Sequence, residues 1–152
     1  MKQIVFEVGG DVIGKGRPRF TRTGKPYTDI RTRLYEKKIR RAFIEAGGEE
    51  LADCPVHIDI ETVAGIQKSV SKATKSRRLS GQELAIKKPD VDNVSKIVLD
   101  ALNGLAYPDD VNVVSMRVIK GRYEDEPRLI VRIRESSPEE ISEIHRWLWS
   151  DE

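Results

Sequence analysis

Apolar and polar residues alternate in four stretches of this chain, and each stretch predicts a β-strand because successive side chains of a strand point to opposite faces. The alternating apolar positions are Ile4, Phe6 and Val8; Val56, Ile58 and Ile60; Val114, Met116 and Val118; and Leu129, Val131 and Ile133. In the second stretch the polar positions hold His57, Asp59 and Glu61. We therefore expect one solvated face there, with His57 on the surface rather than in a ligand site.

Three other segments repeat their apolar residues every three to four positions, which predicts amphipathic helices. The first is expected over residues 28–46, ending at Gly47 and Gly48. The second is expected to have Asp92 as its N-cap and to end at Asn103-Gly104. The third is expected to begin at Ser137. The expected inward positions of the second and third helices are Val94, Val98, Ala101 and Leu102, and Ile141, Ile144 and Leu148.

The order of these elements predicts the fold class. The last two strands flank a polar turn from Gly121 to Pro127, which favours a hairpin. Strands and helices follow one another without a regular β-α-β alternation. We therefore expect one α+β domain over residues 1–152, a mixed sheet with helices packed mainly on one face. Trp147 and Trp149, near the end of the chain, are expected to seal the core or a dimer contact.

Composition narrows the class of protein. The chain has 152 residues, of which 38% are hydrophobic and 34% charged, so one domain with a real core is expected. No apolar run approaches the roughly 18 residues of a membrane helix, and the first residues lack a signal-peptide pattern. Cys54 is the single cysteine, which fits a reducing cytoplasm. It is expected as a small core residue rather than as a nucleophile.

The small net charge of +2 hides an uneven distribution. Residues 1–88 carry 19 Lys and Arg against 11 Asp and Glu, a balance of +8, and residues 89–152 have a balance of −6. A basic half beside an acidic half suits a polyanionic substrate that is held at one surface and altered at another. An ordinary mixed surface would show the same split.

Two segments concentrate the positive charge. The first, GKGRPRFTRTGKPY, is expected to contact nucleic acid or to be a solvated loop, and its Phe20 and Tyr27 are available for packing or stacking. The second, GIQKSVSKATKSRRLSG, is expected to be a short helix or a mobile loop that clamps phosphates. The cations proposed to bind DNA are Lys15, Arg17, Arg19, Lys72, Lys75, Arg77 and Arg78.

The strongest chemical signal lies in KPDVDNVSKIVLDALNGLAYPDD, residues 88–110. It contains Lys96 and five aspartates, namely Asp90, Asp92, Asp100, Asp109 and Asp110. If residues 90–92 are extended, Asp90 and Asp92 leave the same face of the chain. Asp92, Lys96 and Asp100 then share one helix face at four-residue spacing.

Gathered carboxylates repel one another, so a fold tolerates them with a bound cation or in open water. All-oxygen ligands favour Mg²⁺ or Mn²⁺ and disfavour zinc. A helix cap, a solvated face and a polar turn would also explain each residue singly.

This combination of motifs resembles the signature of RusA-type Holliday-junction resolvases, a family of small endodeoxyribonucleases. The resemblance rests on KPDVDNVSKIVLDALNG followed by DDVNV, with support from GKGRPRFTRTGKPYT, and covers most of the chain. It implies that Asp90, Asp92 and Asp110 are catalytic residues that bind Mg²⁺, with Mn²⁺ able to substitute, and that Lys96 is catalytic. The family often has glutamine where this chain has Asn112, which leaves open whether Asp109 or Asp110 faces the metal.

The resemblance also implies a homodimer that cleaves a four-way DNA junction in recombination and repair. Two alternatives stay open. One is a nuclease with a similar site that acts on flaps or forks. The other is a protein that binds DNA structures without cutting them, in which the carboxylates are simply a solvated face.

Overall fold

The computed structural model describes residues 2–150. Its main sheet has four strands in the order β1-β6-β4-β5. β6 is antiparallel to β1 and β4, whereas β5 is parallel to β4. The strands are β1 (Gln3–Gly9), β4 (Val56–Gly65), β5 (Val113–Glu124) and β6 (Arg128–Glu135), with a separate pair β2 (Arg19–Phe20) and β3 (Pro26–Tyr27). The helices are α1 (Ile30–Glu45), α2 (Lys72–Leu79), α3 (Val91–Leu102), the 3-10 turn η1 (Asp110–Asn112) and α4 (Pro138–Trp149). The expected α+β class with a mixed sheet is confirmed.

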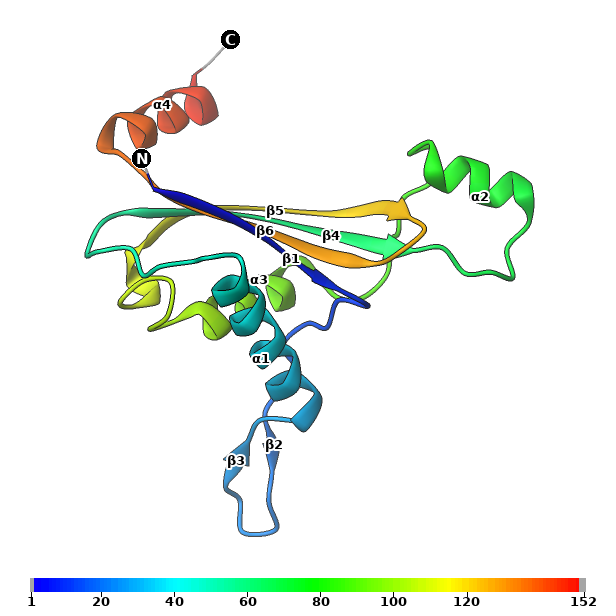
Figure 1. Ribbon diagram of the computed structural model, residues 1–152, viewed down its shortest axis with the longest axis horizontal. Helices are drawn as coiled ribbons and strands as arrows, with labels where there is room; N and C mark the ends of the chain where they lie inside the picture. Colours follow the sequence, from blue (N-terminus) through cyan, green and yellow to red (C-terminus); the bar gives the residue numbers. More distant parts are fainter. Residues whose placement is uncertain (1, 151–152) are drawn as a thin grey trace.

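The core lies between one face of the sheet and the helices α1 and α3 (Figure 1). Tyr35, Ile39 and Phe43 of α1 are buried, and the Phe43 ring meets the edge of Phe6 with centroids 5.9 Å apart. Burying an aliphatic or aromatic side chain of this size contributes about 1.5–3 kcal/mol. The Arg40 guanidinium donates to the Ala101 carbonyl over 3.0 Å, which joins α1 to the last turn of α3.

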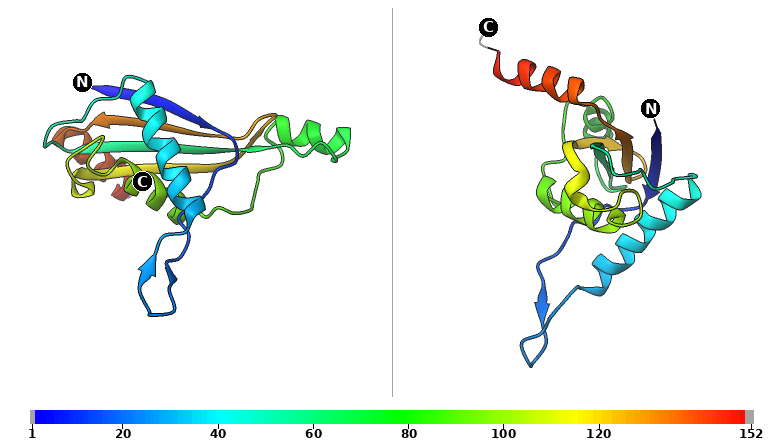
Figure 2. Two further views of the ribbon diagram at one scale, coloured as in Figure 1. Left: turned by 60° about the horizontal axis from the view of Figure 1, so that its bottom comes forward. Right: turned by 90° about the vertical axis from the view of Figure 1, so that its left-hand side faces the viewer.

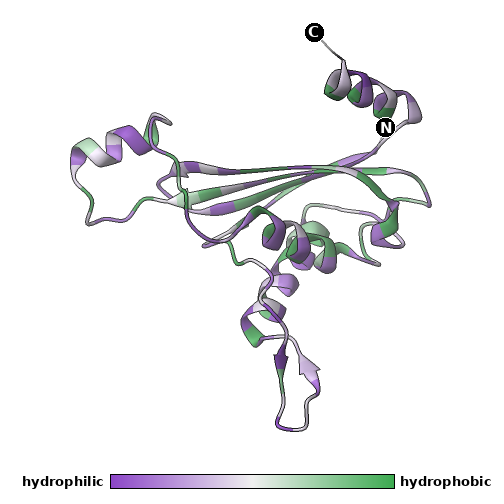
Figure 3. Cartoon of the chain, turned by 180° about the vertical axis from the view of Figure 1, so that it is seen from behind, coloured by the Kyte–Doolittle hydropathy of each residue, from purple (hydrophilic) through white to green (hydrophobic). Residues whose placement is uncertain are grey.

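Two basic segments project from this body. The β2–β3 pair forms a hairpin that extends beyond the start of α1, and α2 lies beyond the ends of β4 and β5 (Figures 1 and 2). Both are mainly hydrophilic (Figure 3), and no residue of α2 is buried. Of the two structures expected for residues 65–81, the short helix is therefore the one observed.

The expected hairpin of the last two strands is wrong, because β4 lies between β5 and β6. Residues 125–127 cross the end of β4, where the Ile66 N–H donates to the Glu124 carbonyl over 3.2 Å. Gly65 permits this crossing, since a Cβ on it would lie 2.9 Å from Pro127 Cδ. Alternation thus located both strands but did not indicate their neighbours.

A β-bulge also shifts the inward positions of β5. Val56 pairs with Val113 and His57 with Ser115, so Val114 is the extra residue, and its side chain is 49% exposed. Val113, rather than the expected Val114, packs against the core together with Met116 and Val118. An inserted residue reverses the alternation from that point onward.

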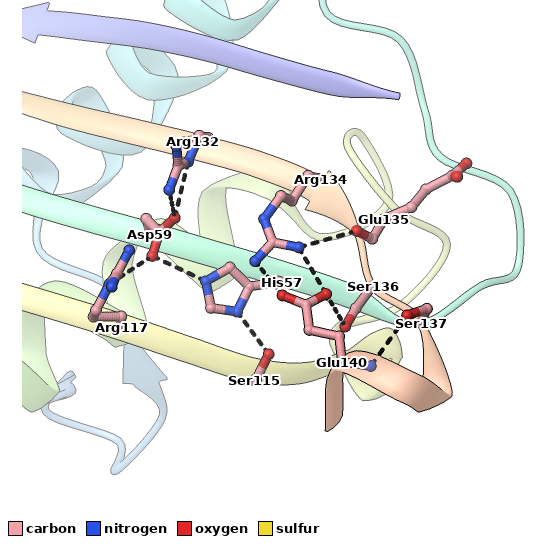
Figure 4. A network of polar contacts seen from close by, with 10 residues as sticks. All are labelled: His57, Asp59, Ser115, Arg117, Arg132, Arg134, Glu135, Ser136, Ser137 and Glu140. Carbon is pink, nitrogen blue, oxygen red and sulfur yellow. Dashed lines mark hydrogen bonds and ion pairs between the residues drawn. The ribbon is translucent and has the colours of Figure 1, made fainter. Parts of the chain in front are cut away.

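His57 is buried at 7% exposure, which corrects the expected surface position. Its ring lies between the Ser115 hydroxyl (2.6 Å) and the Asp59 carboxylate (2.9 Å) on the sheet face opposite α3 (Figure 4). Asp59 also accepts from Arg117 and Arg132, each over 2.9 Å. Partial burial opposes ionisation of Asp59, but these hydrogen bonds outweigh it and lower its pKa to about 2. Paired long side chains, rather than water, cover this part of the face.

The final helix begins as expected but packs differently. The Ser137 hydroxyl accepts from the Glu140 N–H over 3.2 Å, and Arg134 donates to the Glu140 carboxylate over 2.8 Å. No residue of α4 is buried, however, and Trp147 and Trp149 are 78% and 72% exposed. The two tryptophans therefore do not seal the core of this chain, because α4 extends away from the sheet (Figure 2).

Cys54 is half-buried and packs against the core, as expected. Burial raises the pKa of its thiol, and the negative charges of Glu135 and Asp53 raise it further. A thiol held protonated in this way is a poor nucleophile.

Candidate active site

Asp90, not Asp92, is the residue that precedes α3. Its backbone is extended, with φ −73° and ψ 153°, and its carbonyl accepts from the Val94 N–H over 3.0 Å. Asp92 instead lies in the first helical turn, where the helix dipole favours a carboxylate. The expected extended run over residues 90–92 is therefore wrong, because the helix begins two residues earlier than the sequence indicated.

The apolar side of α3 determines which side chains remain outside. Its five buried residues are Val94, Ile97, Val98, Ala101 and Leu102. Asp92, Lys96 and Asp100 are all exposed, at the expected four-residue spacing. The prediction of one charged helix face is confirmed.

A tight loop returns the chain from the end of α3 to its side. Gly104 has φ +72°, and its N–H donates to the Tyr107 carbonyl over 3.0 Å. Tyr107 is buried, and its hydroxyl donates to the Leu99 carbonyl over 3.2 Å. Burial, followed by the negative charges of Asp110 and Asp100, raises the pKa of this phenol. Both carboxylates therefore lie close to Tyr107.

Like charges are crowded at the start of η1. The pKa of Asp110 lies above its ordinary value, first because of its hydrogen bond with Asp109 and further because of the charges of Asp109 and Asp100. Asn112 has a structural role here, since its amide donates to Asp53 over 2.8 Å and its side-chain oxygen accepts from the Asp109 N–H over 3.3 Å.

Two neighbouring cavities form the surface around these carboxylates. One, of about 350 Å³, is lined by Asp90, and the other, of about 460 Å³, by Lys96, Asp100 and Asp110. Both include Lys15, Gly16 and Asn93, so these three residues lie between Asp90 and Asp110. Asp92 and Asp109 line neither cavity. The structure thus brings Asp90 and Asp110 to adjoining cavities, whereas Asp92 is an exposed residue outside both linings.

The segment before the hairpin packs closely against α3. The Lys15 N–H donates to the Asn93 carbonyl over 2.9 Å, and the Lys15 ammonium contacts Glu36 (2.7 Å) and Asp100 (3.1 Å). Burial opposes the charge on Lys15, but the hydrogen bonds to both carboxylates outweigh it and raise its pKa. Lys15 therefore neutralises part of the acidic face rather than standing free on the surface.

The donor chemistry suits a hard divalent cation, since carboxylates dominate and like-charge crowding would be relieved by one. Within residues 2–150, however, no three His, Cys, Asp or Glu side chains are grouped closely enough to hold a metal ion. The predicted set of Asp90, Asp92 and Asp110 comes from two elements, α3 and η1, and does not converge on one point in this arrangement.

The other predicted DNA-binding cations differ in their contacts. Arg17 lines the larger cavity, and Arg19 is exposed, with a long contact of 3.8 Å to Asp29. Phe20 and Tyr27 in the same hairpin are also exposed.

On α2, Lys72 is exposed, whereas Lys75 contacts Asp125 over 3.4 Å. Arg77 and Arg78 both contact Glu83, over 3.6 and 3.1 Å, and Arg78 stacks on Tyr123. Arg78 is thus largely engaged in packing α2 against the sheet.

Sequence reasoning did not single out Asn93, which lines both cavities. The signal was present, because Asn93 is three residues before Lys96 and so lies beside it on the helix. A polar residue next to the expected charged face was a candidate on spacing alone.

Comparisons with known proteins identify the family of this chain. The family model described as endodeoxyribonuclease RusA matches residues 9–134. The uncharacterized protein YqaN of Bacillus subtilis (strain 168) is 36% identical over 142 residues, which cover 90% of this chain and 99% of YqaN. None of the helices in residues 2–150 has the length and hydropathy of a membrane span. The matched residues include all of α3 and η1, and the chain belongs to the RusA endodeoxyribonuclease family.

Proposed function

We propose that this protein is a structure-specific endodeoxyribonuclease that resolves four-way DNA junctions by paired hydrolysis of phosphodiester bonds, in DNA recombination and repair. The observation that carries the proposal is the position of Asp90 and Asp110 on adjoining cavities, with Lys96 and Asn93 beside them, in a chain of this family. A nuclease needs acidic and basic groups on one accessible surface, and this surface supplies both.

We propose that Asp90, Asp92 and Asp110 hold Mg²⁺, with Mn²⁺ able to substitute. When bound, such an ion lowers the pKa of a water molecule and stabilises charge on the phosphate. Asp110, rather than Asp109, is the proposed ligand, because Asp110 lines the cavity beside Lys96. Lys96 would contact the scissile phosphate or the leaving oxygen as negative charge develops there.

The basic hairpin and α2 would hold the arms of the junction. Arg17 and Arg19 on the hairpin side and Lys72 on α2 are the proposed phosphate contacts with the fewest competing acidic partners. Two symmetric cuts require two active sites, so we propose a homodimer whose two-fold axis matches that of the junction. The exposed tryptophans of α4 support a contact with a second protein surface.

The test is cleavage of a synthetic four-way junction, a linear duplex and a flap, with and without Mg²⁺. Paired, Mg²⁺-dependent nicks confined to the junction are expected. Asp90→Asn should abolish these nicks, because it removes a proposed Mg²⁺ ligand. It should keep junction binding, because the lost carboxylate charge repels phosphate. Glu45→Gln, at the exposed end of α1, is the matched control and should cut normally.

Other outcomes would revise the proposal. Cleavage of the flap alone would keep the site and change the substrate. Binding that is unaffected by a chelator, without cleavage under any divalent metal, would favour the DNA-structure-binding alternative. Normal cutting by Asp90→Asn would show that the proposed site is wrong.

A further inference from the structure

Lys120 makes two hydrogen bonds with the backbone just before Asp90. Its ammonium donates to the Lys87 carbonyl over 2.5 Å and to the Pro89 carbonyl over 3.1 Å. Lys120 follows Met116 and Val118 on the face of β5 that α3 covers, which is why its side chain reaches this segment. The Pro89 carbonyl belongs to the peptide unit that joins Pro89 to Asp90.

A second β-bulge in β5 adds another hydrogen bond to the segment before α3. Thr62 pairs with Lys120, but Val63 pairs with Arg122, so Gly121 is an extra residue, with φ +118°. Its carbonyl accepts from the Ala85 N–H over 2.8 Å. β5 is an edge strand, and residues 120 and 121 thus anchor the segment that leads into α3.

We propose that Lys120 is a positioning residue that fixes the backbone of Asp90 at the entrance to α3. The inference rests on the proposed function, in which Asp90 is catalytic. Bulges commonly lie next to active sites, and here the residue before the bulge holds the backbone that leads into Asp90. A catalytic group displaced by about 1 Å can lose on the order of 100-fold in rate.

A simpler role for Lys120 would be contact with a DNA phosphate. It lines a cavity of about 390 Å³ that also contains Lys87 and Lys88. The two roles predict different results, because a phosphate contact acts on affinity and its salt dependence, whereas a positioning residue acts on the rate of the bound complex. Both neighbouring carbonyls already engage the Lys120 ammonium, which favours positioning.

The experiment compares Lys120→Met, Lys120→Arg and Lys87→Met. Lys87→Met is the matched control, because it removes a positive charge from the same cavity and keeps the Lys87 carbonyl. Single-turnover cleavage at saturating protein should fall about 10- to 100-fold in Lys120→Met, with junction Kd within about threefold of the unmodified chain. Lys120→Arg, which can still donate to both carbonyls, should recover most of the rate, and Lys87→Met should cut normally.

Hydrogen exchange supplies a readout that needs no cleavage. The Val94 amide, bonded to the Asp90 carbonyl, should exchange about tenfold faster in Lys120→Met and normally in Lys87→Met. Equal loss of affinity in Lys120→Met and Lys87→Met, with an unchanged rate, would overturn positioning in favour of phosphate contact. Full rate and full Val94 protection in Lys120→Met would overturn it outright.

The outcomes also separate this inference from the proposed function. Faster Val94 exchange in a protein that cuts no DNA would retain the positioning and reject the nuclease. If Lys120→Met does not fold, Lys120→Gln, which keeps one donor group, gives the same comparison at smaller amplitude.

Discussion

Gly14→Ala tests whether the close contact between the segment before the hairpin and α3 holds the candidate active site in place. A Cβ at residue 14 would lie 2.9 Å from Pro89 Cβ and 3.0 Å from Asn93 Cβ. Neither atom is the free end of a flexible side chain, so the backbone itself must move. Pro89 precedes Asp90 and Asn93 lines both cavities, and the displacement would therefore reach the site directly.

The size of the effect follows from overpacking. Adding a methyl group to a well-packed contact costs about 1–3 kcal/mol of the free energy of unfolding. Replacing glycine also reduces the conformational entropy of the unfolded chain, which stabilises the folded protein by about 0.4–1 kcal/mol. Gly9→Ala is the matched control, because no heavy atom lies within 4 Å of its ideal Cβ and its φ is not positive. The difference between the two variants isolates the clash.

Thermal unfolding measures that difference. At about 2–4 °C per kcal/mol for a domain of this size, Gly14→Ala should melt about 2–12 °C below Gly9→Ala. Its cleavage of a four-way junction should also slow, whereas Gly9→Ala should cut normally. Melting temperatures within about 1 °C of each other would refute the close contact of Gly14 with Pro89 and Asn93.

Three further predictions concern stability and assembly. Asp59 has a pKa of about 2, so its contribution to stability is complete above pH 4 to 5 and is lost as the pH falls towards 2. In urea unfolding, the free energy of unfolding of Asp59→Asn should fall less steeply over that pH range than that of the unmodified chain, and an equal fall would contradict the ion pairing of Asp59. Leu102→Ala should cost about 2–5 kcal/mol in the same assay, against little change for the exposed Leu34→Ala. In the proposed homodimer, acrylamide should quench Trp147 and Trp149 less at high protein concentration than at low, and equal quenching would place the dimer contact elsewhere.

The sequence predicted local structure well because periodicity reports which side chains a single element buries. The apolar spacing of α3 correctly placed Asp92, Lys96 and Asp100 on its outer face. What it could not indicate was partnership between distant strands. The insertion of β4 between β5 and β6, and the bulges at Val114 and Gly121, depend on hydrogen bonds to residues far along the chain.

In the candidate site, too, the sequence predicted local features but not contacts between distant residues. Motif spacing identified Asp90 and Asp110, which line adjoining cavities, but it placed Asp92 beside Asp90 because the start of α3 was misjudged by two residues. His57 was expected in water because strand alternation carries no information about arginines from neighbouring strands. Lys120 had no local signal, since its role depends on a bulge and on a loop some thirty positions earlier in the chain.

The order of strands in the sheet has a consequence for how the chain folds. Residues 57 and 115, which meet across β4 and β5, are 58 positions apart, and Glu7 and Arg128, which meet across β1 and β6, are 121 apart. The consecutive strands β4 and β5 pair in parallel, and within residues 2–150 no two strands of the main sheet form a hairpin. No local hairpin can therefore nucleate the sheet, and folding must first overcome the entropic cost of closing long loops. We expect slow folding with a high contact order. During synthesis β1 would remain unpaired until β6 has emerged from the ribosome.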